Sequence, residues 1–272
     1  ASYDSSSRFD VSGIINIIKE AQEKAFDTYN LKEFDYFVAA TPPNTKVDEI
    51  STTISYLKND SNYLNSTILG CDFWQSRTGW SLIAHEIGHA FGLVDLYDLR
   101  SLESPVAKSK FYLDQFQFLG FFDLMNWPTG PAPELTAWNR WMLGFISDQE
   151  IRCISGKTTI ESIAPIESDS NSLKSLFIRL SNSELLVIES RASIGFDNKL
   201  PADATGLIVY IVNFDIDSGD GPIKLITKNG RKTNFLYDSV LQSGDRLNTS
   251  QIYIENLGRT LNGAIRVRVL HR

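Results

Sequence analysis

Apolar residues in the first hundred positions follow helical spacing in some segments and strand spacing in others. From Val11 to Tyr29 they recur every three or four residues, which predicts an amphipathic helix. Two short apolar runs, Asp35–Ala40 and Thr67–Cys71, are followed by turn-forming residues and predict strands. A second helix is expected over Thr78–Phe91, with a threonine as its N-cap and Gly92 ending it. The first part of the chain therefore mixes helix and strand.

The period of the pattern changes near residues 147–157. Before this point, residues 99–131 predict a long irregular loop, and Pro133–Leu143 predicts a short helix. Beyond it, short apolar runs alternate with turn-rich segments and predict strands at Thr158–Ala164, Leu176–Leu180, Glu184–Arg191, Gly206–Phe214, Gln251–Asn256 and Ala264–Leu270. We expect an α+β chain with two domains, residues 1–150 and a β-rich, sandwich-like domain at 151–272.

Composition narrows the class of partner. The 272 residues are 42% hydrophobic and 22% charged, with a formal charge of −7 and no basic cluster. Nucleic acid and anionic lipid are therefore not expected as partners, and no apolar run reaches the roughly 18 residues of a membrane helix. The two cysteines, Cys71 and Cys153, fit either a disulfide or two buried free thiols. No signal peptide is visible in the polar residues 1–8.

The strongest chemical signal is the sequence His-Glu-Ile-Gly-His at residues 85–89. Residues four apart on a helix lie on one face, so His85 and His89 can both direct imidazole nitrogens at one metal ion. Two imidazoles are typical zinc ligands. Glu86, next to the first ligand, is the expected general base toward a zinc-bound water.

A catalytic zinc site needs one more protein ligand, and the following residues supply a candidate. Gly92 permits a backbone conformation that lets the chain leave the helix and turn back, and Asp95 follows three residues later. The spacing matches the metzincin template with Asp95 in place of its third histidine. Glu103 and Glu134 are rivals, as in gluzincin-type enzymes, where a later glutamate completes the site.

The stretch from His85 to Asp98 resembles the zinc motif of the immune inhibitor A (thuringilysin-like) family of zinc metallopeptidases, which is related to the metzincins. The sequence Asp-Leu-Met-Asn at 123–126 is similar to the Met-turn of that family, and residues 133–144 are similar to its following helix. The resemblance implies a mixed sheet with an active-site helix. It also implies that Met125 forms an apolar floor beneath the three ligands.

The resemblance has limits at individual positions. Some metzincins have a tyrosine two residues after the Met-turn methionine, and here that residue is Trp127. Tyr97 is a candidate for transition-state contact, with packing as the alternative. Asp98 and Asp123 are candidates for orienting the imidazoles, with turn or cap roles as the alternative.

These observations together predict a secreted or extracytoplasmic zinc endopeptidase that hydrolyses peptide bonds of protein or peptide substrates. One alternative is a non-catalytic, zinc-stabilised binding or adhesion module. Another is a gluzincin-type aminopeptidase with a glutamate as third ligand. The acidic turn at 215–221 is a candidate Ca²⁺ site or a solvated turn, although its spacing is not that of an EF-hand.

Overall fold

The computed structural model describes residues 11–30, 33–43, 52–54, 63–70, 74, 79–99, 115–228 and 239–272. Its internal contacts divide the chain into two compact units, Ala1–Leu93 and Val94–Arg272. The predicted domain boundary at residue 150 stays a prediction, and strand β4 begins directly after it.

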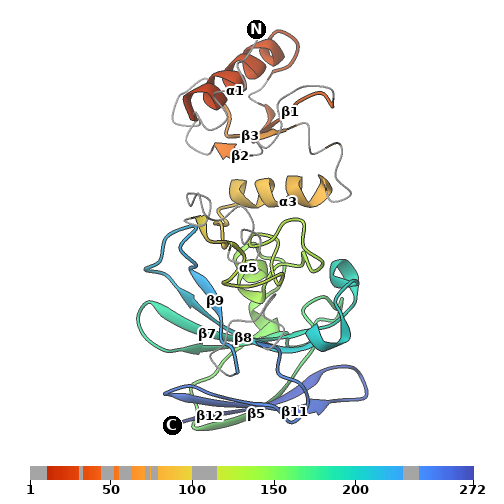
Figure 1. The fold of residues 1–272 in the computed structure, drawn as a ribbon, viewed down its shortest axis with the longest axis vertical. Coiled ribbons are helices and arrows are strands. Elements are labelled where there is room, and N and C mark those ends of the chain that lie inside the picture. The colour runs from red at the N-terminus through yellow and green to blue at the C-terminus, as the bar shows by residue number, and fades with distance from the viewer. Residues whose placement is uncertain are drawn as a thin grey trace. The chain divides into compact units, whose positions relative to one another are not determined.

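The part of the first unit that the structure describes contains a small sheet and the helices α1 and α3. Its elements are α1 (Val11–Phe26), β1 (Phe37–Ala40), β2 (Thr52–Ile54), β3 (Ser66–Leu69) and α3 (Gly79–Ala90) (Figure 1). Strand β3 is central in the order β1-β3-β2, parallel to β1 and antiparallel to β2. The helix and strands predicted in this part are therefore present, together with β2, which the sequence pattern does not reveal.

Helix α1 is attached to the sheet by both apolar and polar contacts. Ile18 on the helix and Ile68 on β3 are fully buried and belong to one small apolar core. The buried side chain of Gln22 donates to the Leu64 carbonyl at 2.9 Å and accepts from the Leu64 amide at 2.8 Å. Because both ends of this amide are bonded, burying it costs little.

In the described residues of the second unit there are two sheets and one short α-helix. Its elements, in chain order, are α5 (Ala137–Met142), η6 (Asp148–Glu150), β4 (Ile151–Cys153), β5 (Thr158–Ile163), β6 (Ser175–Arg179), β7 (Glu184–Arg191), η7 (Gly195–Asp197), η8 (Ala202–Ala204), β8 (Gly206–Asn213), β9 (Ile223–Leu225), β10 (Arg246–Asn248), β11 (Ile252–Arg259) and β12 (Ile265–His271).

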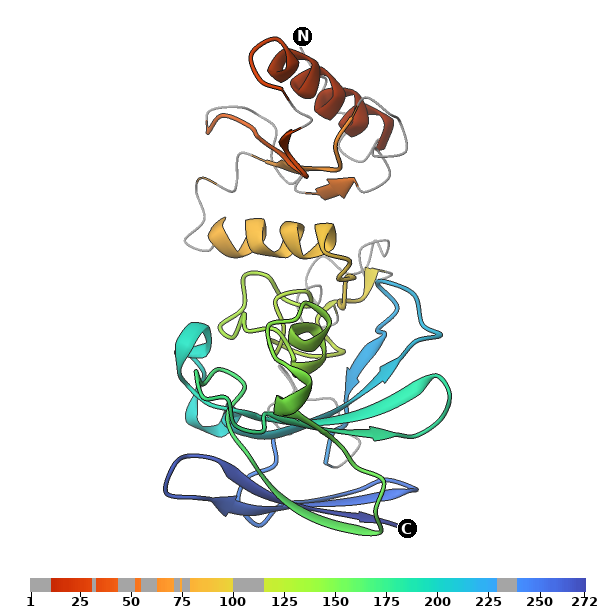
Figure 2. The same cartoon turned by 180° about the vertical axis from the view of Figure 1, so that it is seen from behind.

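The two sheets lie face to face, as both views show (Figures 1 and 2). One has the order β4-β6-β7-β8-β9 and the other β10-β11-β12-β5; all neighbours are antiparallel except β4 and β6. A single apolar core fills the space between them, built from alternate residues such as Leu186 and Ile188 on β7 and Val267 and Val269 on β12.

The opposite face of β7 is also buried, so residues on both faces of this strand are shielded from solvent. Glu189 and Arg191 point away from the apolar core, and α5 packs on this side (Figure 2). The Glu189 carboxylate accepts from the Ala137 amide at the start of α5, at 2.6 Å. The central strands are therefore covered on both faces.

The expectation of an α+β chain with many strands and few helices is confirmed. Two details differ. Helix α5 begins at Ala137 rather than in its predicted first turn at Pro133, because the Thr136 hydroxyl caps it by accepting from the Asn139 amide. Strands β2, β4, β9 and β10 were missed because each has three residues, which is too short to show a period.

Thr78, Cys71 and Glu103 lie outside the described residues. Cys153 is described, and its thiol is free and exposed, so the interpretation of a buried thiol is wrong for this residue. Among the helices that the structure describes, none combines the length and apolar character required to cross a bilayer.

Candidate metal centre

Helix α3 brings the two histidines of the motif together. His85 is buried, at 3% exposure, and His89 is half-buried one turn later. Their ring centroids lie 4.8 Å apart with the ring planes at 85°. This is the arrangement that the four-residue spacing predicts, and it depends only on the helix period.

A backbone carbonyl orients the second imidazole. His89 Nδ1 lies 2.8 Å from the carbonyl oxygen of Leu93. A carbonyl can only accept, so the Nδ1 atom carries the proton and donates it. The Nε2 atom of His89 then keeps its lone pair, which is the form of the ring that binds a metal ion.

The C-terminus of α3 is closed by a Schellman motif. The Leu93 amide donates to the Gly88 carbonyl at 3.0 Å, and the Gly92 amide donates to the His89 carbonyl at 3.0 Å. Gly92 has φ +93°, a conformation that residues with a Cβ atom rarely adopt. The glycine predicted to end the helix therefore does so, and the same turn places the Leu93 carbonyl on His89.

Asp95 joins the two histidines. One potential ligand atom from each of His85, His89 and Asp95 can be chosen so that all three lie within 4.8 Å of one another. Two imidazole nitrogens and a carboxylate oxygen could hold a metal ion. Glu86, adjacent to the first histidine, is buried at 6% exposure.

The segment that follows Asp95 is held by contacts from far along the chain. The Leu96 amide donates to the Met125 carbonyl at 3.0 Å, and the Asp98 amide donates to the Gln115 carbonyl at 2.7 Å. The Asp98 carboxylate is buried and accepts from Gln117 Nε2 at 2.6 Å. Tyr97 is half-buried. The roles predicted for Tyr97 and Asp98 at the metal stay predictions, and for His89 the orienting group is the Leu93 carbonyl.

The Met-turn predicted at residues 123–126 is a tight turn around a buried carboxylate. Asp123 accepts from the Met125 amide at 2.7 Å, from the Thr136 amide at 2.8 Å and from Asn139 Nδ2 at 3.0 Å. Burial raises the pKa of Asp123 to about 6, although these hydrogen bonds lower it. Met125 is fully buried. Asp123 thus acts as a turn and cap residue that connects the turn at 123–126 to α5.

Sequence reasoning missed a buried ionic cluster around Arg191. Its guanidinium lies 2.8 Å from a Glu189 oxygen and 2.9 Å from an Asp197 oxygen, and it donates to the Phe122 carbonyl at 2.9 Å. Burial raises the pKa of nearby Glu167 to about 9, and repulsion from Asp197 adds to the effect of burial. The cluster connects β7 to the segment just before the Met-turn. A single arginine in a strand shows no pattern in the sequence that would reveal it.

Glu134, one of the two rival third ligands, does not join the metal group, and Glu103, the other, lies outside the described residues. Glu134 forms an ion pair with Arg140 at 2.6 Å, and its carboxylate also accepts from the Leu135 amide. In the part of the chain that the structure describes, His85, His89 and Asp95 form the one group of three or more His, Cys, Asp or Glu residues that could hold a metal ion. The acidic turn at 215–221 therefore does not gather three carboxylates at one point.

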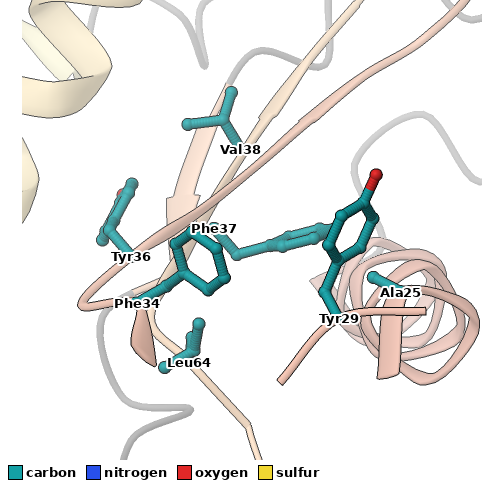
Figure 3. A pocket seen from close by; sticks show the side chains of 7 residues that line it. All are labelled: Ala25, Tyr29, Phe34, Tyr36, Phe37, Val38 and Leu64. Carbon is teal, nitrogen blue, oxygen red and sulfur yellow. The ribbon is translucent and has the colours of Figure 1, made fainter. Parts of the chain in front are cut away.

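The first unit also contains an apolar cavity of ≈ 240 Å³ (Figure 3). It is lined by side chains of α1, β1 and their connections: Ala25, Tyr29, Phe34, Tyr36, Phe37, Val38 and Leu64. Four of these residues are phenylalanine or tyrosine, and none of the metal-group residues lines the cavity.

Comparisons with models of protein families, with curated proteins and with solved structures give no match to this chain. The functional interpretation therefore rests on the residues and their geometry.

Proposed function

We propose that this chain is a zinc-dependent endopeptidase of the metzincin type, similar to the immune inhibitor A metallopeptidases. The observation that carries the proposal is the convergence of His85, His89 and Asp95, with potential ligand atoms within 4.8 Å of one another, beside the buried Glu86. Neither half of this arrangement alone indicates a protease. A metal site needs only the three ligands, whereas a buried carboxylate next to the first ligand adds a base.

The donor set fits zinc. Zinc accepts imidazole nitrogen and carboxylate oxygen, and in catalytic sites it uses three protein ligands. The tautomer of His89 that its bond to Leu93 requires leaves Nε2 available as a ligand. When bound, zinc supplies Lewis acidity that polarises a peptide carbonyl and makes water a stronger nucleophile near neutral pH.

The residues of the chain perform the remaining tasks. Glu86 accepts a proton from the attacking water and delivers it to the leaving amine, which is the role of a general base that then becomes a general acid. Its burial keeps bulk water away from the carboxylate, so the proton passes between Glu86 and the reacting atoms. Asp95 gives the ligand set one negative charge, which a set of three histidines lacks.

The metzincin assignment is supported by three features in one order along the chain. Gly92 turns the backbone with φ +93°, Asp95 follows it, and a tight turn with a buried methionine lies further on at Met125. We also propose an extracytoplasmic location and protein or peptide substrates, on the basis of the same resemblance.

The test compares the wild type with Glu86→Gln in hydrolysis of casein and of a fluorogenic peptide, together with the metal content of both proteins. We expect one zinc ion in each and a loss of cleavage of about 10²- to 10⁴-fold in the variant. Glu161→Gln, which changes a half-buried strand residue paired with Arg152, is the matched control and should keep full activity. Equal cleavage by Glu86→Gln would rule out the mechanism.

The same preparation separates the alternatives. A non-catalytic module would bind zinc without cleaving any substrate. A gluzincin-type enzyme would lose zinc in Glu103→Ala or Glu134→Ala and keep it in Asp95→Ala. The ion pair between Glu134 and Arg140 and the place of Asp95 in the metal group favour the opposite result.

A further inference from the structure

The turn between β8 and β9 contacts the backbone on both sides of Asp95. The Asp95 amide donates to the hydroxyl of Ser218 at 3.0 Å. The Gly219 amide donates to the Asp95 carbonyl at 2.9 Å, and the Leu99 amide donates to the Gly219 carbonyl at 3.0 Å. Three hydrogen bonds from two adjacent residues therefore hold the segment Asp95–Leu99, more than 110 residues earlier in the chain.

Gly219 is required at this point for two independent reasons. Its φ is +79°, where residues with a Cβ atom are strained. A Cβ atom added there would lie 2.8 Å from Leu99 Cβ and closer still to the Cγ and Cδ1 atoms of the same side chain. The close approach of the two segments thus depends on the missing side chain.

Other contacts hold the same segment from a different part of the chain. Leu96 is bonded to Met125, and Asp98 is bonded to Gln115 and Gln117. The β8–β9 turn also touches this second support, because a Cβ atom at Gly221 would lie 2.7 Å from Phe118 Cγ. The backbone of Asp95 is therefore bonded to the β8–β9 turn, and the residues that follow it are bonded to Met125 and Gln115.

From these contacts we infer that Ser218 and Gly219 are positioning residues for the third metal ligand, Asp95. The inference rests on the proposed metal site. The acidic turn at 215–221 then has a function other than calcium binding or simple solvation. Its backbone and the Ser218 hydroxyl fix the backbone position from which the Asp95 side chain extends. The β-rich half of the chain would in this way take part in metal binding without supplying a ligand.

The experiment measures zinc affinity by competition with a chromogenic chelator, and the visible absorption spectrum of the protein loaded with Co²⁺. We expect Gly219→Ala to weaken zinc binding by roughly 10- to 100-fold and to change the Co²⁺ spectrum, as loss of a group that orients a ligand typically does. Ser218→Ala loses one exposed hydrogen bond and should weaken binding by about 2- to 10-fold. Ser218→Thr keeps the hydroxyl and should restore the affinity.

Two controls separate positioning from general damage. Gly244→Ala places a Cβ atom at another positive φ in the same unit, where nothing lies within 4 Å of it. Ser181→Ala removes a hydroxyl that also accepts backbone amides, in the turn before β7. Both variants should bind zinc as the wild type does, whatever their melting temperatures.

Each outcome decides a different claim. Wild-type zinc affinity and an unchanged Co²⁺ spectrum in Gly219→Ala and in Ser218→Ala would overturn the positioning role, even if the wild type is a protease. If Gly219→Ala does not fold, Ser218→Ala and Ser218→Thr carry the test. A wild type that binds zinc and cleaves nothing would refute the proposed function and leave this inference standing. A wild type that binds no metal would overturn both.

Discussion

The histidines and the aspartate of the candidate metal centre are held by different kinds of contact. His85 and His89 lie on one helix, and hydrogen bonds among residues 87–93 close its C-terminus. Asp95 lies in an irregular segment whose backbone bonds reach Gln115, Met125 and Gly219. Distant substitutions should therefore disturb the aspartate while leaving the pair of histidines in place.

The two kinds of contact predict different sensitivities of the metal ligands to substitution. A helix period is enforced by bonds between near neighbours, so it tolerates most changes elsewhere. The position of a segment held by long-range hydrogen bonds depends on the positions of the distant elements that form those bonds. Substitutions in the β-rich half should therefore reach the metal centre through Asp95.

The largest effect is expected where the long-range support is most deeply buried. Arg191→Met leaves the carboxylates of Glu189 and Asp197 buried without their cation, and we expect a loss of about 3–5 kcal/mol in the free energy of unfolding. Urea denaturation at pH 7 measures this value. Arg152→Met, at an exposed ion pair with Glu161, should cost less than about 1 kcal/mol. Equal costs would show that the cluster does not anchor this region.

Removing a ligand tests both sides of the comparison. Structural zinc sites bind with ~10–16 kcal/mol over four ligands, so one ligand corresponds to about 100- to 1,000-fold in affinity. We expect losses of this order in His85→Ala, in His89→Ala and in Asp95→Ala, measured by chelator competition. His271→Ala, in the third histidine of the chain, is the control. A metal affinity unchanged in Asp95→Ala would remove the aspartate from the site.

Protonation of the buried Asp123 carboxylate gives a pH test of the long-range contacts around the turn at 123–126. Burial raises the pKa of Asp123 from an ordinary 3.8 to about 6, so the folded state binds this proton more tightly than the unfolded state. Its contribution to stability is fully present below pH 3.8, is lost as the pH rises to about 6, and amounts to about 3 kcal/mol. Urea denaturation from pH 4 to 8 should show this decrease in the wild type and a flatter profile in Asp123→Asn.

Asp245 provides a control of opposite sign. Partial burial raises the pKa of Asp245, but hydrogen bonds from Lys228 and from the Gln242 amide lower it by more, so the net shift is downward. Its contribution to stability is present above pH 3.8 and is lost as the pH falls. Asp245→Asn should therefore leave the decrease between pH 4 and 6 intact. A profile flattened equally by both substitutions would contradict the assignment to Asp123.

The smallest effect is expected at the glycine that ends α3. An added Cβ atom at Gly92 would meet nothing within 4 Å. Gly92→Ala should therefore lower the free energy of unfolding by about 1 kcal/mol, through the strain of the positive φ alone. Thermal denaturation measures the loss, and zinc affinity should stay within about threefold of the wild type. A larger loss of affinity than in Gly219→Ala would reverse the proposed difference between local and long-range support.

Much of the fold could be predicted from periodicity. The strand patterns from residue 158 onward correspond to β5, β6, β7, β8, β11 and β12. These strands are long enough to show a pattern, whereas the three-residue strands are not. The start of α5 was misplaced because Pro133 is a general signal for a first helical turn, while the cap depends on the particular bond from the Asn139 amide to Thr136.

The sequence by itself determined the pair of histidines, the glutamate between them and the glycine that ends their helix, because all four depend on bonds between residues a few positions apart. Tertiary structure alone decided which residues hold Asp95 and how Arg191 and Asp123 are satisfied in the interior. Those answers depend on segments separated by tens of residues, and their meeting is set by the packing of whole sheets and loops. No local pattern in the chain records it.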